Sequence, residues 1–452
     1  MPDDVQVNSI FRCQRNLLSQ SSLDLSESTS NHWLRQLFAV CGCVFHDQSI
    51  RASLFAFVLT RSSILFVALL AANVRFEAPV ITPLGEVRGS TISLRNRRVS
   101  DVLREITLGA DSLWLIDVAR RGYENEPFNT DTQHNWAFFP LFPLLLRAAA
   151  RVTGEFPLTG MALSNCFLFL ALVLLHKAAG AFGYDLAASD RAVFYMAAFP
   201  ASYFFSLAQT ESLFLLLTVG CLYAARRERW WLAGCGGALA SATRFAGVFL
   251  LLPLGLLYWQ TYRAAAAGGT SPDSKRSERI SKRFAGTVID GNLVALLLVP
   301  LGLIAFMIFL KAITGNALAF ADIQVAWGHS AGFFWRPLLT YLRDPFVVAT
   351  GWDFRLLNFA AAMTALICGS VLLWRHEWAL GSYALISIVV PMSSGPLLQS
   401  LARYTMVIFP VCFVLAAAGR SPRVDQFIRL IFIGLLCLMS ALLASRVTLT
   451  FA

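Results

Sequence analysis

Charged side chains are scarce in this chain of 452 residues. Asp, Glu, Lys and Arg together make up 14% of it, whereas hydrophobic residues make up 57%. A soluble domain usually has about a quarter of its residues charged, because these residues cover its surface. The composition therefore excludes an ordinary soluble domain and predicts a polytopic membrane protein.

Several motifs that indicate other chemistry are missing. No G-x-x-x-x-G-K-[ST] occurs, so a P-loop nucleotide site is excluded. His134 and His329 stand alone in polar stretches, without partners at metal-ligand spacing, so neither a metal nor another cofactor is predicted. Cys41 and Cys43 form a single C-x-C without a second pair, which disfavours a zinc site.

The net charge of +10 does not form a single basic patch. The Arg residues are scattered between apolar runs, which is typical of a membrane protein with basic cytoplasmic loops. A nucleic-acid binder would instead gather them on one face. The predicted partners are therefore membrane lipids, and nucleic acid is not among them.

Apolar runs of about 20 residues predict eleven spans in an all-α fold. Residues 1–52 are predicted to form a cytoplasmic tail with a short interfacial helix at 33–45, and 53–452 a multi-span domain. No signal peptide is expected, because the first long apolar run starts beyond residue 50. The spans are expected at 53–74, 158–180, 188–206, 207–225, 230–243, 245–262, 288–312, 355–374, 378–393, 404–419 and 427–445.

Short basic connections predict the orientation, because such loops face the cytoplasm. This rule places a loop at 263–287 inside and two loops, 75–157 and 313–353, outside. It also requires that the run 138–152 does not cross the membrane. That run is short, interrupted by proline and basic, which favours an interfacial helix. The basic connections used are 226–229, 263–283, 375–376 and 420–423.

With this orientation, four charged residues come to the outer face. Asp111 opens the densest polar segment of the chain, 111–143, while Glu211, Arg244 and Arg403 lie at outer turns or helix ends. A carboxylate can take a proton from an attacking hydroxyl, and Arg can hold a phosphate that leaves with negative charge. The set therefore indicates a reaction with a lipid-linked phosphate.

Five motifs, in order along the chain, resemble the PIG-V family of mannosyltransferases. The first joins Asp111-Ser112, Gly122-Tyr123 and the aromatic-proline run 137–143, as in the outer-loop signature of that family. The others are Gln209-Thr210-Glu211-Ser212-Leu213-Phe214, Ala242-Thr243-Arg244, Ala402-Arg403-Tyr404 with Phe409-Pro410, and Gly315 to Phe320 with Gln324 and Trp327.

The resemblance implies a GT-C type glycosyltransferase with a large first outer loop. Such enzymes take sugar from a polyprenyl-phosphate donor, with inversion, and pass it to a lipid or glycan acceptor. The PIG-V family makes the second mannose transfer in GPI-anchor assembly and has many bacterial relatives. A bacterial inner membrane is therefore expected, or the endoplasmic reticulum if the source is eukaryotic.

The resemblance also implies roles for residues of this chain. Asp111 stands where the family has its catalytic base, although Ala110 replaces the Trp that commonly precedes it, which leaves Asp117 in reserve. Glu211 is expected to orient the acceptor or an Arg, and Arg244 and Arg403 to bind the donor phosphate. Further substrate contacts are expected from Tyr123, Phe139, Pro140, Gln209, Tyr404, Gln324 and Trp327.

Each of these residues also has a purely structural interpretation. Asp111 could cap the helix that follows it, and Glu211 could do the same together with Thr210. Asp117 lies about 240° around the helix from Asp111, so it could instead pair with a neighbouring Arg. The two arginines could reach lipid headgroups, and the aromatic run could form an interfacial belt.

A transporter or lipid flippase is the main alternative function, because intramembrane charges also mark transport pathways. It predicts an internal repeat and charges near mid-membrane in broken helices. The two halves show no convincing repeat, and the charges gather at one face, which favours the enzyme. A structural scaffold would explain the spans but not this clustering.

Overall fold

The computed structural model describes residues 47–77, 80–81, 87–88, 91–94, 97–266, 291–343, 355–394 and 400–445. Most of these residues are helical, so the predicted all-α membrane architecture is confirmed. The interfacial helix predicted at 33–45 and most of the loop predicted at 263–287 lie outside the described residues.

Five helical segments among the described residues are long and apolar enough to cross a membrane: α3 (Gln48–Asn73), α7 (Pro157–Ala181), Phe245–Arg263, α17 (Arg355–Trp374) and α21 (Pro422–Ala444). A sixth candidate is a broken pair, in which α14 (Leu301–Thr314) meets the segment Ala319–Trp327 at 82°. The other predicted spans form shorter helices, so the count of eleven stays a prediction. These helices are α8 (Leu186–Ala198), α9 (Glu211–Arg226), α10 (Trp230–Ser241), α13 (Gly291–Leu296), α18 (Trp378–Met392), α19 (Leu401–Met406) and α20 (Pro410–Ala418).

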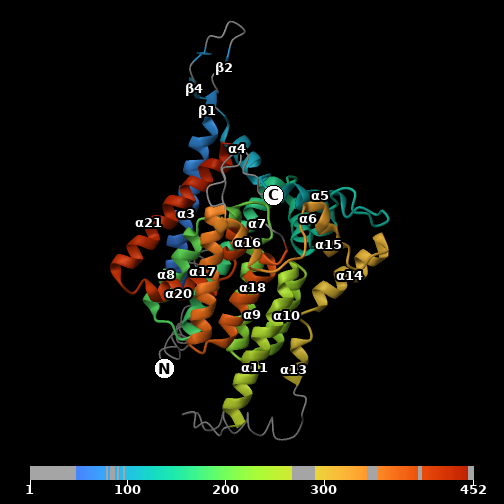
Figure 1. Ribbon diagram of the computed structural model, residues 1–452, viewed down its shortest axis with the longest axis vertical. Helices are drawn as coiled ribbons and strands as arrows, with labels where there is room; N and C mark the ends of the chain where they lie inside the picture. Colours follow the sequence, from blue (N-terminus) through green and yellow to red (C-terminus); the bar gives the residue numbers. More distant parts are fainter. Residues whose placement is uncertain are drawn as a thin grey trace, which may run out of the picture.

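The segment predicted as the first outer loop has structure of its own. Two short antiparallel pairs, β1 (Val74–Glu77) with β4 (Thr91–Leu94) and β2 (Val80–Ile81) with β3 (Val87–Arg88), form a projection. Figure 1 shows it extending from the end of α3. The sequence prediction missed these strands, although they are rich in the β-branched residues that favour strands. The remaining elements of the segment are α4 (Val99–Thr107), α5 (Ser112–Arg121), η1 (Asn135–Ala137) and α6 (Leu141–Thr153).

Helix α6 covers the run that was predicted to lie along the membrane face. One side of it is buried, with Phe142 and Leu146 fully enclosed, while Leu144 and Val152 on the other side are exposed. Arg147 Nε donates to the Ala119 carbonyl at 2.6 Å and so ties α6 to α5. This two-sided helix is consistent with an interfacial position.

The helical body is packed through small residues where backbones come close. Figure 1 shows α3 beside α21, the first and last described helices of the chain. In α10, a Cβ added at Gly234 would lie 2.0 Å from the Ala295 carbonyl oxygen of α13. Similarly, a Cβ at Gly302 would lie 2.1 Å from the Ala238 carbonyl oxygen. Glycine is therefore required for this close helix contact, as is common between membrane helices.

Two of the connections predicted to face the cytoplasm, 226–229 and 420–423, lie near one end of α7. Arg226 Nε donates to the Ala181 carbonyl at 3.1 Å, and Arg420 lies 3.6 Å from the Asp185 carboxylate. The segment 75–157 leads into the other end of α7, which is 25 residues long and thus spans about 37 Å. These two connections and the segment 75–157 therefore lie at opposite ends of α7.

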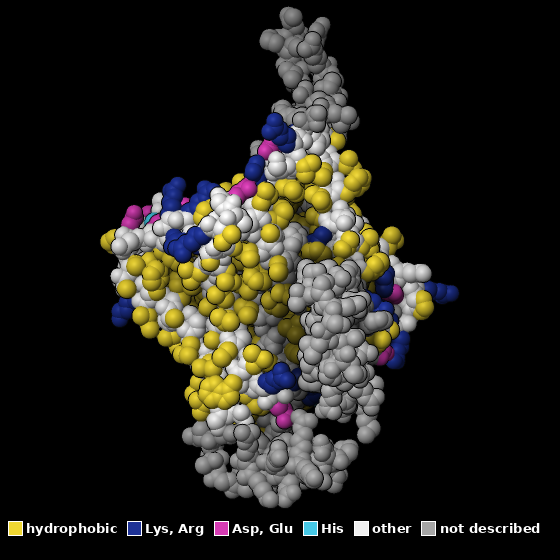
Figure 2. All heavy atoms as spheres, turned by 180° about the vertical axis from the view of Figure 1, so that it is seen from behind, with side chains coloured by type: hydrophobic (Ala, Val, Ile, Leu, Met, Phe, Trp, Pro, Cys, Tyr) yellow, Lys and Arg dark blue, Asp and Glu magenta, His cyan; other side chains and the backbone are white. Residues whose placement is uncertain are grey.

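Hydrophobic side chains cover much of the surface between these ends. Figure 2 shows them spread over the middle of one face, with charged side chains mostly toward its margins. Exposed Phe55, Phe66, Ile308 and Phe427 belong to α3, α14 and α21. Such a surface would be unstable in water and is the one that a lipid environment accepts.

Candidate active site

The four charged residues picked out in the sequence lie where regular helices give way to irregular backbone. Glu211 begins α9, directly after the short 3-10 helix η2 (Ser202–Ser206) and its following turn. Arg244 lies between α10 and the 3-10 helix η3 (Phe245–Leu250), and Arg403 lies on the short helix α19. Asp111 precedes α5.

Glu211 is at the centre of this group and is completely buried. Its Oε1 atom accepts hydrogen bonds from Arg244 Nη1 at 2.7 Å and from Arg403 Nε at 2.5 Å. A buried carboxylate needs such partners, because an unpaired charge in the interior is very costly. Thr210, at the N-cap position of α9, makes no side-chain capping bond, so Glu211 serves the two arginines rather than the helix end.

Asp111 joins the group through Arg403, whose Nη1 atom donates to Asp111 Oδ2 at 2.5 Å. Asp111 occupies the N-cap position of α5, yet its side chain makes no capping bond there. The capping interpretation is therefore not realised. The preceding Ala110 has a φ of 51°, which is unfavourable for a residue with a Cβ and shows a sharply turned backbone before Asp111.

The four residues form a row, Arg244–Glu211–Arg403–Asp111, in which the signs of charge alternate. Exposure of the side chains rises along part of this row, from 0% at Glu211 to 12% at Arg403 and 34% at Asp111. Asp111 is thus the more exposed carboxylate of the row, whereas Glu211 is sealed behind the arginines. Two opposite pairs leave the row electrically neutral overall.

Both guanidinium groups retain N–H donors. Among the described residues, no partner contacts Arg403 Nη2, nor the Nε and Nη2 atoms of Arg244. Aromatic rings flank both groups: Arg403 Cζ lies 5.0 Å from the Phe204 ring, and Arg244 Cζ lies 5.6 Å from the Tyr404 ring. Such rings hold a guanidinium plane in place without consuming its donors.

Several buried polar atoms on the same segments have no hydrogen-bond partner. Gln209 Nε2 donates to the Gly109 carbonyl at 3.1 Å, but its Oε1 atom is unpaired. Buried polar atoms are normally satisfied, so such a group of exceptions fits a place where buried water completes the bonding. Besides Gln209 Oε1, these atoms are Glu211 Oε2, Ser112 Oγ, Tyr203 Oη and Thr405 Oγ1.

The reserve candidate Asp117 lies outside the row. Its carboxylate is 3.3 Å from Arg121 Nε, and the Arg121 side chain is largely exposed. This is the neighbouring-Arg pairing that helix geometry predicted. Among the described residues, Asp111 is therefore the carboxylate of α5 that faces the arginines.

Three residues that were predicted to contact the substrate make local packing contacts instead. They are Tyr123, Phe139 and Pro140. The Tyr123 hydroxyl donates to the Phe138 carbonyl at 2.6 Å, and burial raises the pKa of this hydroxyl, so it stays a donor. Phe139 is buried against Phe306 of α14, with ring centroids 4.9 Å apart. Pro140 occupies the N-cap position of α6. Among the described contacts of these three residues, none is with the charged row.

Trp327 lies beside α5 in an aromatic group that the sequence analysis did not identify. Trp114 is stacked on Phe138 at 5.8 Å and meets Trp327 edge-on at 5.3 Å. Trp114 follows Asp111 by three residues, and this helical spacing is the signal that could have identified it. Gln324 donates to the Phe320 carbonyl of its own segment, so its amide is used locally.

His134, expected to stand alone, belongs to a buried cluster. Its Nδ1 atom lies 2.5 Å from Glu124 Oε2, and its ring stacks on Trp136 at 4.1 Å. Trp136 Nε1 in turn donates to the Glu124 carbonyl. Glu124 lies ten residues before His134, so the two side chains meet only when the segment folds. In the described parts of the chain, no three side chains of metal-binding type cluster.

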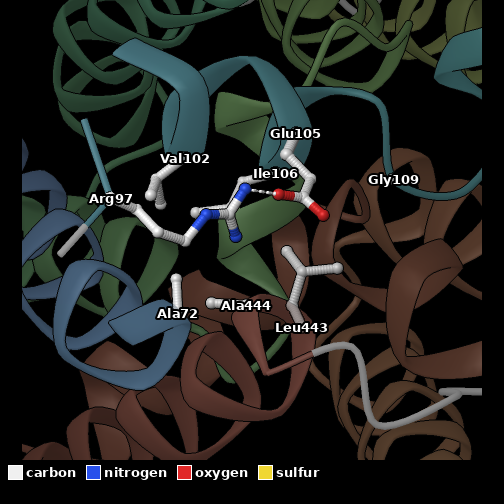
Figure 3. Close-up of a pocket in the computed structure, with 8 residues that line it drawn as sticks. All are labelled: Ala72, Arg97, Val102, Glu105, Ile106, Gly109, Leu443 and Ala444. Carbon is white, nitrogen blue, oxygen red and sulfur yellow. Dashed lines mark hydrogen bonds and ion pairs between the residues drawn. The ribbon is translucent and has the colours of Figure 1, made fainter. Parts of the chain in front are cut away.

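A small cavity of about 130 Å³ lies behind the backbone that carries Asp111. Figure 3 shows Arg97 and Glu105 paired across it, with Leu443 and Gly109 on its wall. Gly109 is two residues before Asp111, and its carbonyl is the one that Gln209 holds. The cavity includes none of the four charged residues, so it adjoins the candidate site without forming part of it.

Comparison with known proteins identifies the family of this chain. A profile of the family described as Mannosyltransferase (PIG-V) matches residues 51–312, more than half of the chain. The chain belongs to the PIG-V mannosyltransferase family. The PIG-V match contains Asp111, Glu211 and Arg244 and ends before Arg403, which enters the site from much later in the sequence.

Two relatives named GPI alpha-1,6-mannosyltransferase 2 resemble part of this PIG-V protein. The one from Cricetulus griseus is 34% identical over 169 residues, covering 33% of this chain and 31% of that protein. The one from Rattus norvegicus is 30% identical over 193 residues, covering 38% and 34%. The matched segments thus span about a third of these curated relatives.

Two solved structures show a weak likeness to this PIG-V protein. The apo oligosaccharyltransferase of Archaeoglobus fulgidus has a TM-score of 0.39 and 14% identity, covering 86% of this chain and 56% of that one. The AglB oligosaccharyltransferase of the same organism, in complex with an inhibitory peptide and a dolichol-phosphate, has a TM-score of 0.40 at the same identity and coverage. Scores below 0.5 carry no weight for the function.

Proposed function

We propose that this PIG-V family protein is a GT-C type glycosyltransferase. It transfers a hexose, with mannose as the first candidate, from a polyprenyl-phosphate donor to a lipid or glycan acceptor. The observation that carries the proposal is the row Arg244–Glu211–Arg403–Asp111, which combines a reachable carboxylate with two guanidinium groups that retain free donors. The family membership supports the choice of sugar.

In the proposed reaction, the acceptor hydroxyl oxygen attacks the anomeric carbon of the donor sugar from the face opposite the phosphate. Asp111 Oδ takes the hydroxyl proton as the new carbon–oxygen bond forms. The bond from the anomeric carbon to the phosphate oxygen breaks, and the phosphate leaves with the electron pair. Attack from the opposite face inverts the anomeric configuration.

The contacts of the two arginines indicate different roles in the proposed reaction. Arg403 already uses Nε and Nη1 on the two carboxylates, so its main role is to hold Asp111 in place. Arg244 uses only Nη1 on Glu211 and the neighbouring Thr210. It therefore has more donors to offer the leaving phosphate, whose growing charge a guanidinium group stabilises.

The proposed site faces away from the cytoplasm, in a bacterial inner membrane or, for a eukaryotic source, in the endoplasmic reticulum. Support comes from the separation of the two ends of the molecule. Two basic connections, 226–229 and 420–423, contact Ala181 and Asp185 at one end of α7, and the segment with Asp111 leads into the other. By the positive-inside rule, the site end is then the outer one.

A transfer assay tests this function directly. Purified protein is incubated with polyprenyl-phosphate bearing radiolabelled mannose and a membrane lipid extract, and label in the extract is measured. The wild type is expected to transfer label, and Asp111→Asn to reduce transfer by about 10²- to 10⁴-fold, because the proton acceptor is lost. Asp117→Asn is the matched control and is expected to stay near wild type.

Equal losses in the two variants would remove Asp111 as the base. No transfer by folded wild-type protein with several donor sugars would contradict the enzyme itself. In that case, flux of labelled lipid across protein-containing vesicles would test the transporter alternative.

A further inference from the structure

Arg61 lies near the middle of α3, the first candidate span, where a charged side chain is expensive to place. Charged residues at such a depth are usually kept for a function or a specific structural need. Neither the sequence motifs nor the proposed reaction accounts for Arg61. Its contacts therefore need an explanation of their own.

All five N–H donors of Arg61 are used, and each goes to a neutral oxygen. Nη1 donates to the Ser202 carbonyl at 2.8 Å and to Ser206 Oγ at 3.1 Å. Nη2 donates to the Ala197 carbonyl at 2.8 Å and to Ser202 Oγ at 2.9 Å. Nε is 3.3 Å from Thr60 Oγ1. Among the described residues, no carboxylate pairs with Arg61.

Three of these acceptors, the Ala197 carbonyl and both oxygens of Ser202, lie where α8 breaks and η2 begins. Helix α8 ends at Ala198, and Pro200 follows two residues later, which has no N–H to continue the helical bonds. Carbonyls at such an end need donors from elsewhere, above all in a membrane. The guanidinium group of Arg61 donates on both sides of the break, while Ser202 Oγ also donates to the Ala197 carbonyl at 2.6 Å. Arg61 thereby ties η2 to α3.

The other side of η2 contacts the charged row. Arg403 lies over the ring of Phe204, and Ser212 Oγ of α9 donates to the Phe205 carbonyl at 2.8 Å. Ser212 directly follows Glu211. Helix η2 therefore lies between Arg61 on one side and the residues that carry Arg403 and Glu211 on the other.

We propose that Arg61 is a positioning residue for the transfer reaction. Its guanidinium fork holds η2, and η2 holds Arg403 through Phe204 and Glu211 through the contact with Ser212. The inference rests on the proposed function and adds to it a residue that does not touch the substrate. Lysine cannot replace the fork, because a single ammonium group cannot reach both Ala197 and Ser202 in the same geometry.

The test compares Arg61→Lys with Arg191→Lys in the full-length protein. Arg191 is a matched control, since its Nε donates to a helix carbonyl, that of Ala416, at 2.9 Å. We expect kcat of Arg61→Lys to fall about 10- to 100-fold, because small misplacements of reacting groups cost that much. The donor KM and the melting temperature are expected to stay close to those of the control.

Two results of this kinetic test would overturn the inference. One is wild-type kcat in Arg61→Lys, which would mean that the charge suffices without the fork. The other is a loss of kcat that merely follows a loss of folded protein, as a general packing role would give. In either case Arg61 does not position the site.

Backbone hydrogen exchange separates this inference from the proposed function. Amides of 201–213 are expected to exchange faster in Arg61→Lys than in wild type, and to be unchanged in Arg191→Lys. If the wild type transfers no sugar, the proposed function fails, and the exchange result alone decides whether Arg61 fixes η2. Unchanged exchange in Arg61→Lys would overturn the inference.

Discussion

Removal of the buried charge of Glu211 should destabilise the protein more than any other single change in the site. Glu211→Gln keeps the size of the side chain but leaves Arg244 and Arg403 facing a neutral amide. Both arginines are more than four-fifths buried and now share one carboxylate oxygen, Glu211 Oε1. The variant therefore leaves two guanidinium groups with only Asp111 as a counter-charge in the row.

The expected loss of free energy of unfolding follows from the burial of this row. Breaking a buried ion pair by removing one partner costs about 3–5 kcal/mol, because the remaining charge is uncompensated. Arg403 keeps its bond to Asp111, and the arginines retain some exposure to solvent, so the lower end applies. We expect Glu211→Gln to lower the free energy of unfolding by about 3 kcal/mol. Asp111→Asn, at the exposed end of the row, should lower it by about 1 kcal/mol or less.

Reversible unfolding in mixed detergent micelles measures both values. Glu126→Gln is the matched control, because Glu126 is exposed and should change the free energy of unfolding by less than about 0.5 kcal/mol. If Glu211→Gln were as stable as this control, Glu211 would not be the buried counter-charge of the arginines. If Asp111→Asn were the less stable of the two site variants, the order of burial along the row would be wrong.

Three further changes test other parts of the structure. Arg244→Gln should raise the donor KM more than it lowers kcat, because it removes a phosphate donor; an unchanged donor dependence would make Arg244 a structural residue only. Tyr123→Phe should lower the free energy of unfolding by about 1 kcal/mol through loss of its bond to the Phe138 carbonyl, and no change would mean that this bond adds nothing. Gly234→Ala should cost about 1–3 kcal/mol by forcing α10 and α13 apart, whereas Gly255→Ala, with open space around it, should not; equal stability of these two variants would contradict the close contact.

The charged row shows how far sequence reasoning reached. Asp111, Glu211, Arg244 and Arg403 could be selected because charges are costly in an apolar chain, and those that remain tend to have a use. Their grouping at one face followed from counting spans. Which atoms pair with which could not be predicted, because Arg403 reaches Asp111 across 292 positions of the chain.

Arg61 shows where the same reasoning failed. It lies inside an apolar run that was correctly predicted as helical, and its partners are carbonyls rather than charged side chains. Carbonyl oxygens are present at every residue, so no sequence pattern marks those that a break in α8 leaves without a donor. The strands β1–β4 were missed for a different reason, since short β-branched runs in a polar loop give only a weak signal.

By itself, the sequence determined the class of the protein, because 57% hydrophobic residues and long apolar runs permit few folds other than a membrane helix bundle. It also supplied the charged residues and the motifs of the PIG-V family. The tertiary structure alone decided that Glu211 is sealed between two arginines and that Asp111 is left at the exposed end. Burial depends on which helices break and pack against each other, and a local sequence pattern does not predict such long-range contacts.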